Sequence, residues 1–438
     1  MISEKYRIME YPKVLVISNN SFSKTSNNGR TLGNLFIGWP KDRLAQFCVS
    51  TTTPDYEVCD NYYLMTDRNA LDGFLHLRKG KRCRIEDNLG TEGNTSINGK
   101  KQSKTPLKRL VRHFVWSGKR WNSKEFQKWI NDFNPEVVLV MNSDATFILD
   151  IATEVTSKRN IPLVMFNTEG FYFIDAIKHR NYGPLKIALQ KCNNYIYRKH
   201  FRRMMKKVKL SIHLNSLLAR DFRNEFGGEH IVLYTGSGVQ FDSSNLHIEK
   251  PSFAYMGNFG FDRPQALVEI AEVLQSINPS YMLDVYGKAP AEKVVQMFSE
   301  CSGISYHGMI PYEKVINILH STTILIHAEV QSERYEESLR YGFSTKIADS
   351  ISSGHPFLMF SSSEVAGAKY IIDTGAAWFA QNKTELKDAI LTILSDEVER
   401  SRVLGVARSV AEKNHSIEKN RETFVNAINS VFEQNQLI

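Results

Sequence analysis

Short apolar runs alternate with amphipathic, helix-like segments along this sequence of 438 residues. The clearest runs are residues 14–17, 137–140, 163–166 and 357–360. Four apolar residues in succession are typical of a strand that is buried on both faces, as in a parallel sheet. Strands that alternate with helices therefore predict an α/β protein built on doubly wound sheets. This alternation restricts the possible fold more than any other feature of the chain.

The strand–helix pattern occurs twice, which predicts two domains. The length allows two or three domains of ordinary size. Residues 235–251 read as a linker, so we expect an N-terminal domain over 1–240 and a C-terminal domain over 241–416, followed by an amphipathic helix. The polar and basic stretch at about 78–109 predicts a flexible insertion in the first domain.

Residues 341–356 read as a loop, a short helix and a stop in front of the strand at 357–360. Ser344 or Thr345 is predicted to cap the helix, and Gly354 and Pro356 end it. Lys346 adds a positive charge at the helix start, where backbone amides attract phosphate. The same residues are also compatible with an ordinary capped helix packed under a strand.

Polar clusters follow two of the predicted strands of the first domain. Asp144 follows the strand at 137–140, and Glu169 follows the strand at 163–166. Loops after the carboxyl ends of parallel strands carry ligands in open α/β sheets. Both carboxylates are therefore candidates for an acceptor site, with a capping or turn role as the alternative.

The charge of the chain is divided unevenly. Residues 1–240 carry 38 Lys and Arg against 22 Asp and Glu, whereas residues 241–438 carry 17 against 25. Within the basic part, residues 195–209 show a stripe of apolar side chains flanked by cations. Such a helix either faces the core or lies on anionic lipid, and the charge division favours peripheral membrane contact.

Several function classes lack their motifs. There is no Gly-x-Gly-x-x-Gly for a dinucleotide, no Gly-x-x-x-x-Gly-Lys-Ser/Thr for a P-loop, and no Asp-x-Asp for a chelated metal. The five cysteines form no Cys-x-x-Cys pair, which fits reduced thiols in the cytosol. No apolar run reaches the ~18–20 residues of a membrane span, and the polar residues 1–12 do not read as a signal peptide.

The segment at 341–356 resembles the donor-site motif of family 4 glycosyltransferases. In that motif Glu-Gly-Phe-Gly leads through an apolar stretch to a second Glu and then to Ala-x-Ala-x-Gly-x-Pro. Gly342 and Phe343 match, Asp349 stands at the second Glu, and Gly354 and Pro356 match the end. Tyr341 replaces the first Glu. By this resemblance the first carboxylate lies near the transferred sugar, so donor-sugar contacts differ here.

The resemblance implies the GT-B fold, with two Rossmann-like domains facing across a cleft and the helix at 417–438 crossing back to the first domain. It places Arg263 and Lys346 at the leaving diphosphate and Asp349 at the ribose. Further donor-binding candidates by this resemblance are Gly29, Arg30, Gly257, Lys288, Gly342, Phe343, Ser344 and Thr345. If the reaction inverts configuration, Asp144 or Glu169 is the candidate base.

The function implied is transfer of a sugar from a UDP- or GDP-sugar to a hydroxyl of a lipid-linked glycan, in bacterial capsule or exopolysaccharide synthesis. The resemblance further implies retention of configuration, no metal and no cofactor besides the nucleotide sugar. We expect a cytoplasmic protein, peripheral at the inner membrane face. The alternatives are a nucleotide-sugar 2-epimerase, a catalytically inactive nucleotide-binding member, and a nucleic-acid-binding protein, which the acidic second half disfavours.

Overall fold

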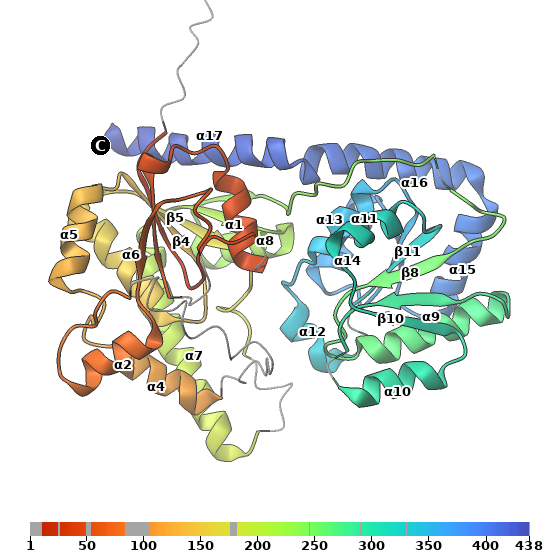
Figure 1. The fold of residues 1–438 in the computed structure, drawn as a ribbon, viewed down its shortest axis with the longest axis horizontal. Helices are drawn as coiled ribbons and strands as arrows, with labels where there is room; N and C mark the ends of the chain where they lie inside the picture. The colour runs from red at the N-terminus through yellow and green to blue at the C-terminus, as the bar shows by residue number, and fades with distance from the viewer. Residues whose placement is uncertain are drawn as a thin grey trace, which may run out of the picture. The chain divides into compact units, whose positions relative to one another are not determined.

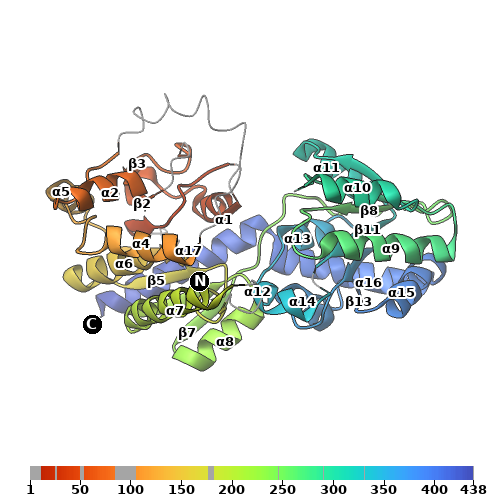
Figure 2. The ribbon, with the colours of Figure 1, turned by 90° about the horizontal axis from the view of Figure 1, so that it is seen from below.

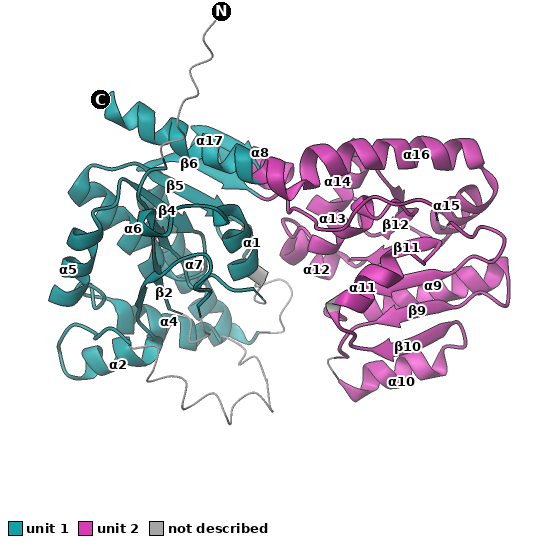
Figure 3. Ribbon diagram, turned by 45° about the horizontal axis from the view of Figure 1, so that its top comes forward, with its two compact units in different colours: residues 1–213, 221–232, 421–438 teal, residues 214–220, 233–420 magenta. Residues whose placement is uncertain are grey.

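A computed structural model describes residues 11–24, 27–49, 54–83, 105–175, 182–244, 246–289, 291–329 and 331–437. The chain divides into two compact units (Figure 3). Unit 1 comprises Met1–His213, Asp221–Val232 and Arg421–Ile438, and unit 2 comprises Leu214–Arg220 and Leu233–Asn420. The expected linker at 235–251 is therefore part of unit 2.

Unit 1 is built on a parallel sheet of seven strands in the order β3-β2-β1-β4-β5-β6-β7 (Figure 1). The strands are β1 (Val14–Ile17), β2 (Leu44–Cys48), β3 (Asn61–Leu64), β4 (Val137–Met141), β5 (Leu163–Asn167), β6 (Val208–His213) and β7 (Glu229–Val232). Every residue of β1, β2, β4 and β5 is buried, so helices cover both faces of the sheet centre. The strand order reverses between β1 and β4, which makes their carboxyl ends the expected ligand position.

The helices of unit 1 form two packed groups. They are α1 (Asn27–Phe36), α2 (Asp67–Leu75), α4 (Pro106–Trp116), α5 (Lys124–Phe133), α6 (Thr146–Arg159) and α7 (Pro184–Met205), with parts of α8 (Ser216–Phe226) and α17 (Ile417–Gln436). In the first group, α2 packs against α4, and α4 and α6 pack against α7 (Figure 2). In the second, Phe36 of α1 packs on Phe424 of α17 with ring centroids 5.0 Å apart.

Unit 2 repeats the architecture with a parallel sheet of six strands in the order β10-β9-β8-β11-β12-β13. Its strands are β8 (Phe253–Met256), β9 (Leu283–Tyr286), β10 (Ile304–Gly308), β11 (Ile324–Ala328), β12 (Phe357–Phe360) and β13 (Trp378–Ala380). Its helices are α9 (Arg263–Ile277), α10 (Glu292–Glu300), α11 (Tyr312–Leu319), α12 (Glu333–Leu339), α13 (Thr345–Ser352), α14 (Ala366–Thr374), α15 (Lys383–Ser395) and α16 (Glu397–Val410). The strand order reverses here between β8 and β11. Two doubly wound parallel sheets were predicted, and this prediction is confirmed.

The basic helix predicted at 195–209 differs from the expectation in two respects. Helix α7 ends at Met205, and the residues after it lead into strand β6. Tyr197, Phe201 and Met204 of the predicted apolar stripe are buried, because they face the core of unit 1. These three side chains are therefore not available to a membrane, although Leu185 and Tyr195 of the same helix are exposed.

Two further expectations need correction. The strand β3 and helix α2 were not predicted, although residues 62–65 (Tyr-Tyr-Leu-Met) form a short apolar run. Helix α4 begins at Pro106, inside the expected insertion at 78–109, where the side chain of Thr105 accepts a hydrogen bond from the Lys108 amide. Residues 84–104 of that insertion lie outside the described residues. Within the described residues, no helix combines the length and apolarity that crossing a membrane requires.

Gly354 closes α13 with a backbone that other residues resist. Its φ is +86°, and a Cβ atom there would lie 2.6 Å from backbone atoms of Asp242. Gly375, after α14, has a φ of +64° but no atom within 4 Å of an added Cβ. The two glycines therefore separate the cost of the left-handed backbone from the cost of a steric clash.

We predict that Gly354→Ala destabilises unit 2 more than Gly375→Ala does. The left-handed backbone alone costs about 1–2 kcal/mol, and overpacking adds about 1–3 kcal/mol at Gly354. Urea unfolding of both variants measures the difference. Equal losses of unfolding free energy in the two variants would show that the backbone at Asp242 moves away from the added Cβ atom at no energetic cost.

Candidate functional site

Helix α13 presents an open N-terminus at the carboxyl edge of the unit 2 sheet. Ile347 and Ile351 are buried and hold the helix on the core, as their spacing predicts. Ser344 occupies the capping position with φ −73° and ψ 129°, but its side chain makes no capping hydrogen bond. The predicted side-chain cap is therefore not formed by Ser344, and Thr345 is already the first helical residue. The partial positive charge of this helix end is left for another acceptor.

Arg263 and Glu329 form a buried ion pair where the strand order of unit 2 reverses. Arg263 begins α9 after β8, and Glu329 follows β11. Only 7% of Arg263 and 9% of Glu329 is exposed. Nη2 of the arginine contacts a carboxylate oxygen of Glu329. The pair joins the two loops at the position where doubly wound sheets bind ligands.

Most donors of the Arg263 guanidinium already have partners inside the protein. Nε donates to the carbonyl oxygen of Ala328 at 3.1 Å, and Nη1 donates to Oδ1 of Asn258 at 2.8 Å. Together with the Glu329 contact, these bonds occupy all three nitrogens. Nη1 also donates to the carbonyl oxygen of Gly260 at 3.5 Å. Four of the five N–H groups of the guanidinium therefore have a partner, and one remains for a ligand. Arg263 therefore acts mainly by its charge and by holding the loops.

The carboxylate of Glu329 is ionised despite its burial. Burial by itself raises the pKa of Glu329, but the hydrogen bond from His327 and the charges of His327 and Arg263 outweigh it and lower the pKa to about 2. Nε2 of His327 lies 2.9 Å from Oε1 of Glu329. The sequence showed Glu329 only as the start of an acidic stretch, so its role was missed.

Lys346 lies in the first turn of α13, close enough to feel the charges of Glu329, Arg263 and Asp349. Its side chain is half-buried, and burial, the largest influence, lowers the pKa of Lys346. Across the residues that the structure describes, it forms no direct hydrogen bond or ion pair. A half-buried ammonium group without a direct partner, at an open helix N-terminus, is suited to binding an anion.

Asp349 lies one turn further along α13 and contacts the segment expected to be a linker. Its Oδ1 accepts a hydrogen bond from Oγ of Ser237 at 2.6 Å, and the same Oγ accepts one from the Val239 amide at 3.1 Å. These bonds fix the residues after 235 on the start of α13. A carboxylate can accept several hydrogen bonds at once.

The motif residues before α13 divide into buried and exposed groups. Tyr341, at the position of the first motif Glu, is 5% exposed, and its carbonyl oxygen accepts a hydrogen bond from Nδ2 of Asn215 at 3.0 Å. Phe343 is half-buried against the rings of Tyr234 and Tyr370, with centroids 5.5 and 5.2 Å away. Gly342 and Thr345 are exposed.

The remaining donor-site candidates of unit 2 lie after β8 and β9. An added Cβ at Gly257 would lie 2.3 Å from Oη of Tyr255, so only glycine fits at the end of β8. Lys288 is exposed in the loop after β9, one strand farther from the reversal point than Arg263. The structure thus brings Arg263, Lys346 and Asp349 together, whereas Lys288 lies one strand away from them, after β9.

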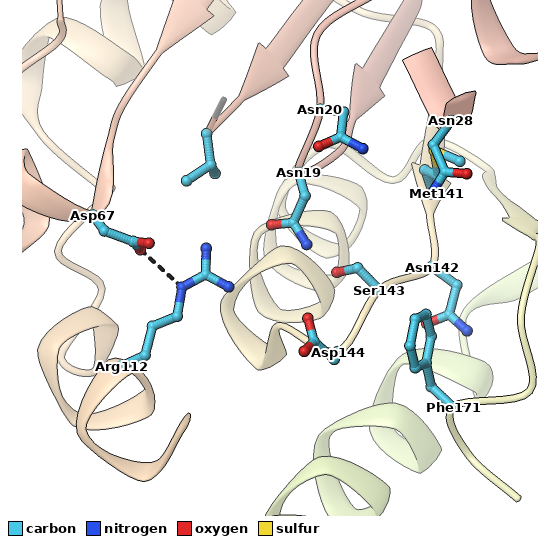
Figure 4. A pocket seen from close by; sticks show the side chains of 11 residues that line it. Asn19, Asn20, Asn28, Asp67, Arg112, Met141, Asn142, Ser143, Asp144 and Phe171 are labelled. Atoms are coloured by element: carbon cyan, nitrogen blue, oxygen red, sulfur yellow. Dashed lines mark hydrogen bonds and ion pairs between the residues drawn. The ribbon is translucent and has the colours of Figure 1, made fainter. Parts of the chain in front are cut away.

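Unit 1 has its own cavity, of about 320 Å³, at the carboxyl ends of its strands (Figure 4). Its lining is mainly polar: Asn19, Asn20, Asn28, Val49, Asp67, Arg112, Met141, Asn142, Ser143, Asp144 and Phe171. Nε of Arg112 donates to Oδ1 of Asp67 at 2.8 Å, and Oδ2 of Asp144 lies 3.4 Å from Nη2 of Arg109. Amide and carboxylate groups that converge on one cavity are suited to a polyhydroxylated ligand.

The predicted site residues of unit 1 differ in whether they line this cavity. Asp144 lines the cavity, whereas Glu169 is exposed and lies outside its lining. Gly29 lets α1 approach the loop after β1, because an added Cβ would lie 2.4 Å from the Ser21 carbonyl oxygen. Arg30 is exposed on α1 and also lies outside the lining.

The sequence analysis missed several lining residues. Asn19 and Asn20 follow a predicted strand, so the rule that selected Asp144 applies to them as well. Asp67 and Arg112 had no such signal, because their helices were not predicted. In the described part of the chain, no group of three His, Cys, Asp or Glu is placed to hold a metal ion.

We predict that Arg263→Met lowers the free energy of unfolding by about 3–5 kcal/mol, because the buried Glu329 is left without its charge partner. The matched control is Lys383→Met, which breaks an exposed pair with Glu272 at 2.8 Å and costs no more than about 1 kcal/mol. Urea unfolding measures both changes. A loss at Arg263 as small as the control would contradict the structural importance of the buried pair.

Comparison with known proteins identifies the fold. No protein-family model and no curated protein sequence matches the chain. Anabaena HepE in complex with UDP is 11% identical with a TM-score of 0.61, and the match covers 95% of this chain and 100% of HepE. Sucrose-phosphate synthase from Thermosynechococcus elongatus is 12% identical with a TM-score of 0.61, over 96% and 100% of the two chains.

A glycosyltransferase from Rickettsia africae is 13% identical with a TM-score of 0.57, over 97% of this chain and 99% of that one. At such low identity these similarities establish the fold and leave membership of family 4 a prediction. The chain has the GT-B fold, with two Rossmann-like domains, as the motif resemblance implied.

Proposed function

We propose that the protein is a glycosyltransferase that moves a sugar from a nucleoside diphosphate to an acceptor hydroxyl. The proposal rests chiefly on Lys346, a half-buried cation without a direct partner among the described residues, at the open N-terminus of α13. The GT-B fold supports it, since HepE is described as binding UDP, glucose and UDP-glucose.

In the proposed reaction, the bond between the anomeric carbon and the β-phosphate oxygen breaks while the acceptor oxygen bonds to that carbon. Charge accumulates on the departing diphosphate, so fixed positive groups lower the barrier. Lys346 and the first amides of α13 supply them, and the charge of Arg263 adds to the field. The proton of the acceptor hydroxyl leaves with the diphosphate if configuration is retained, as the resemblance implies, or on a base if it inverts.

Asp349 is proposed to accept hydrogen bonds from the ribose hydroxyls. It lies one turn beyond Lys346 on the same helix, which matches the distance from diphosphate to ribose along a nucleotide. The hydrogen bond from Ser237 holds the carboxylate in place for this role. Because Tyr341 offers no carboxylate where the motif has its first Glu, the donor sugar is held by other groups.

Unit 1 is proposed to bind the acceptor in its polar cavity. Asp144 lines this cavity, which makes it the preferred base if the reaction inverts configuration, whereas Glu169 lies outside the lining. We further propose a lipid-linked glycan as acceptor and a role in bacterial surface polysaccharide synthesis. The excess of cations in residues 1–240 supports an anionic partner and a peripheral location at the inner membrane face.

Lys346→Ala is predicted to weaken UDP binding by about 30-fold or more, because losing a fixed cation at the diphosphate costs about 2–4 kcal/mol. Titration calorimetry with UDP and with GDP measures the loss of affinity and shows whether the site prefers uracil or guanine as the nucleobase. Lys314→Ala, at an exposed lysine of α11, is the control and should bind as the wild type does. Unchanged binding in the Lys346 variant would refute the donor site. An epimerised UDP-sugar formed without any acceptor would indicate a 2-epimerase instead.

Asp144→Asn is predicted to raise the KM for the acceptor about tenfold if the carboxylate only binds it, which corresponds to about 1.4 kcal/mol. If Asp144 is the base, kcat falls by about 10²–10⁴. Initial rates with varied acceptor separate the two outcomes. The control is Asp132→Asn on α5, where the carboxylate is exposed and pairs with Lys128. If the KM and kcat of both variants equal those of the wild type, the acceptor does not bind in this cavity.

A further inference from the structure

Six large apolar side chains are exposed on two packed helices of unit 1. They are Leu71, Phe74 and Leu75 of α2 and Leu107, Val111 and Phe114 of α4. Their exposed fractions run from 37% to 67%. Helices α2 and α4 pack against each other and lie side by side in Figures 1 and 2. We call these six residues the α2–α4 apolar face.

The apolar face is not the side by which α4 joins the core. Leu107, Val111 and Phe114 follow a spacing of four and three, which makes one stripe on a helix. The attachment is on another side, where Trp116 stacks on Phe147 of α6 with ring centroids 3.9 Å apart. The stripe is thus a second apolar surface, left in water. Exposed apolar side chains that share one stripe of a helix are a candidate interaction site.

The segments that carry the apolar face are rich in cations. Residues 67–83 and 105–124 contain eleven Lys and Arg but only two Asp and no Glu. Both acids are already paired, Asp67 with Arg112 at 2.8 Å and Asp72 with Arg78 at 2.6 Å. Two of the eleven cations also pair with acids outside these segments, Lys119 with Glu154 at 2.7 Å and Arg109 with Asp144 at 3.4 Å. The two segments still carry more positive than negative charge beside the apolar side chains.

We propose that the α2–α4 apolar face docks on an anionic lipid bilayer. Leu, Val and Phe enter the boundary between headgroups and acyl chains, and the surrounding cations attract acidic headgroups. A second copy of the chain fits poorly, because two such surfaces would bring like charges together. Nucleic acid fits poorly as well, since the aliphatic side chains of Leu107 and Val111 offer neither stacking nor hydrogen bonds to bases.

The same two helices carry residues of the acceptor cavity. Asp67 of α2 and Arg112 of α4 line it. A bilayer at the apolar face therefore brings lipid headgroups to the helices that would hold a lipid-linked acceptor. The inference deepens the membrane location within the proposed function, but it does not depend on the transfer reaction.

Vesicle sedimentation tests the docking surface. Wild-type protein should sediment with vesicles that contain phosphatidylglycerol and much less with vesicles of phosphatidylcholine alone, and high salt should release it. The double variant Val111→Asp, Phe114→Asp should lose about tenfold or more in partitioning, because two charges replace side chains at the lipid boundary. Circular dichroism and UDP titration should match the wild type, since both positions are exposed and lie outside the cavity.

Val398→Asp on α16 is the matched control, because Val398 is an apolar side chain of unit 2 that is 82% exposed and stands between Glu397 and Glu399 in the sequence. It should bind vesicles as the wild type does. Equal binding by the double variant, or no binding of the wild type to anionic vesicles, overturns the proposal. A lipid-free dimer that the double variant abolishes would overturn it in favour of a second copy. UDP binding by Lys346→Ala is a separate measurement from vesicle sedimentation. The proposed docking surface and the proposed donor site can therefore be rejected independently of each other.

Discussion

The buried pair of Arg263 and Glu329 is the interaction on which the unit 2 site depends. It joins the loops after β8 and β11 at the reversal of strand order, where no strand pairing crosses between the loops themselves. Removing two charges from water is costly, so the pair persists only because Asn258, Ala328 and His327 satisfy its remaining groups. The pair carries no net charge, so its main effect is to fix the two loops at the sheet edge. In the proposed function, the start of α13 and Lys346 then supply the positive charge that binds an anion.

The different roles proposed for Arg263 and Lys346 follow from the number of hydrogen bonds that each side chain already makes. Arg263 has most of its donors engaged, whereas Lys346 has no direct partner among the described residues. A ligand phosphate would therefore bond to Lys346 and to the amides of α13, and it would experience Arg263 mainly as a field. The resemblance to the glycosyltransferase motif assigned both residues to the diphosphate. The hydrogen bonds of the structure favour a positioning role for Arg263 and a binding role for Lys346 within the proposed function.

Unit 1 shows how the same type of residue can serve core and surface. Tyr197, Phe201 and Met204 of α7 are buried, while the apolar face of α2 and α4 is exposed. Both sets have helical spacing, and only packing distinguishes them. A basic amphipathic helix in a sequence is therefore insufficient evidence for membrane contact. The exposed stripe of α4 is stronger evidence, because another side of that helix already holds it on α6.

The sequence alone indicated the two parallel sheets, since continuous apolar runs of four residues that alternate with helix-like segments are typical of strands buried on both faces. It also located α13, whose cap position, apolar spacing and Gly354 stop are local features. Local information could not place Glu329 beside Arg263, because 66 residues separate them and only the adjacency of β8 and β11 joins them. It missed Asp67 and Arg112 of the cavity for the same reason. Tertiary packing also decided which apolar helix faces are buried. Helical periodicity in the sequence shows that a helix has an apolar face, but it does not show what that face packs against.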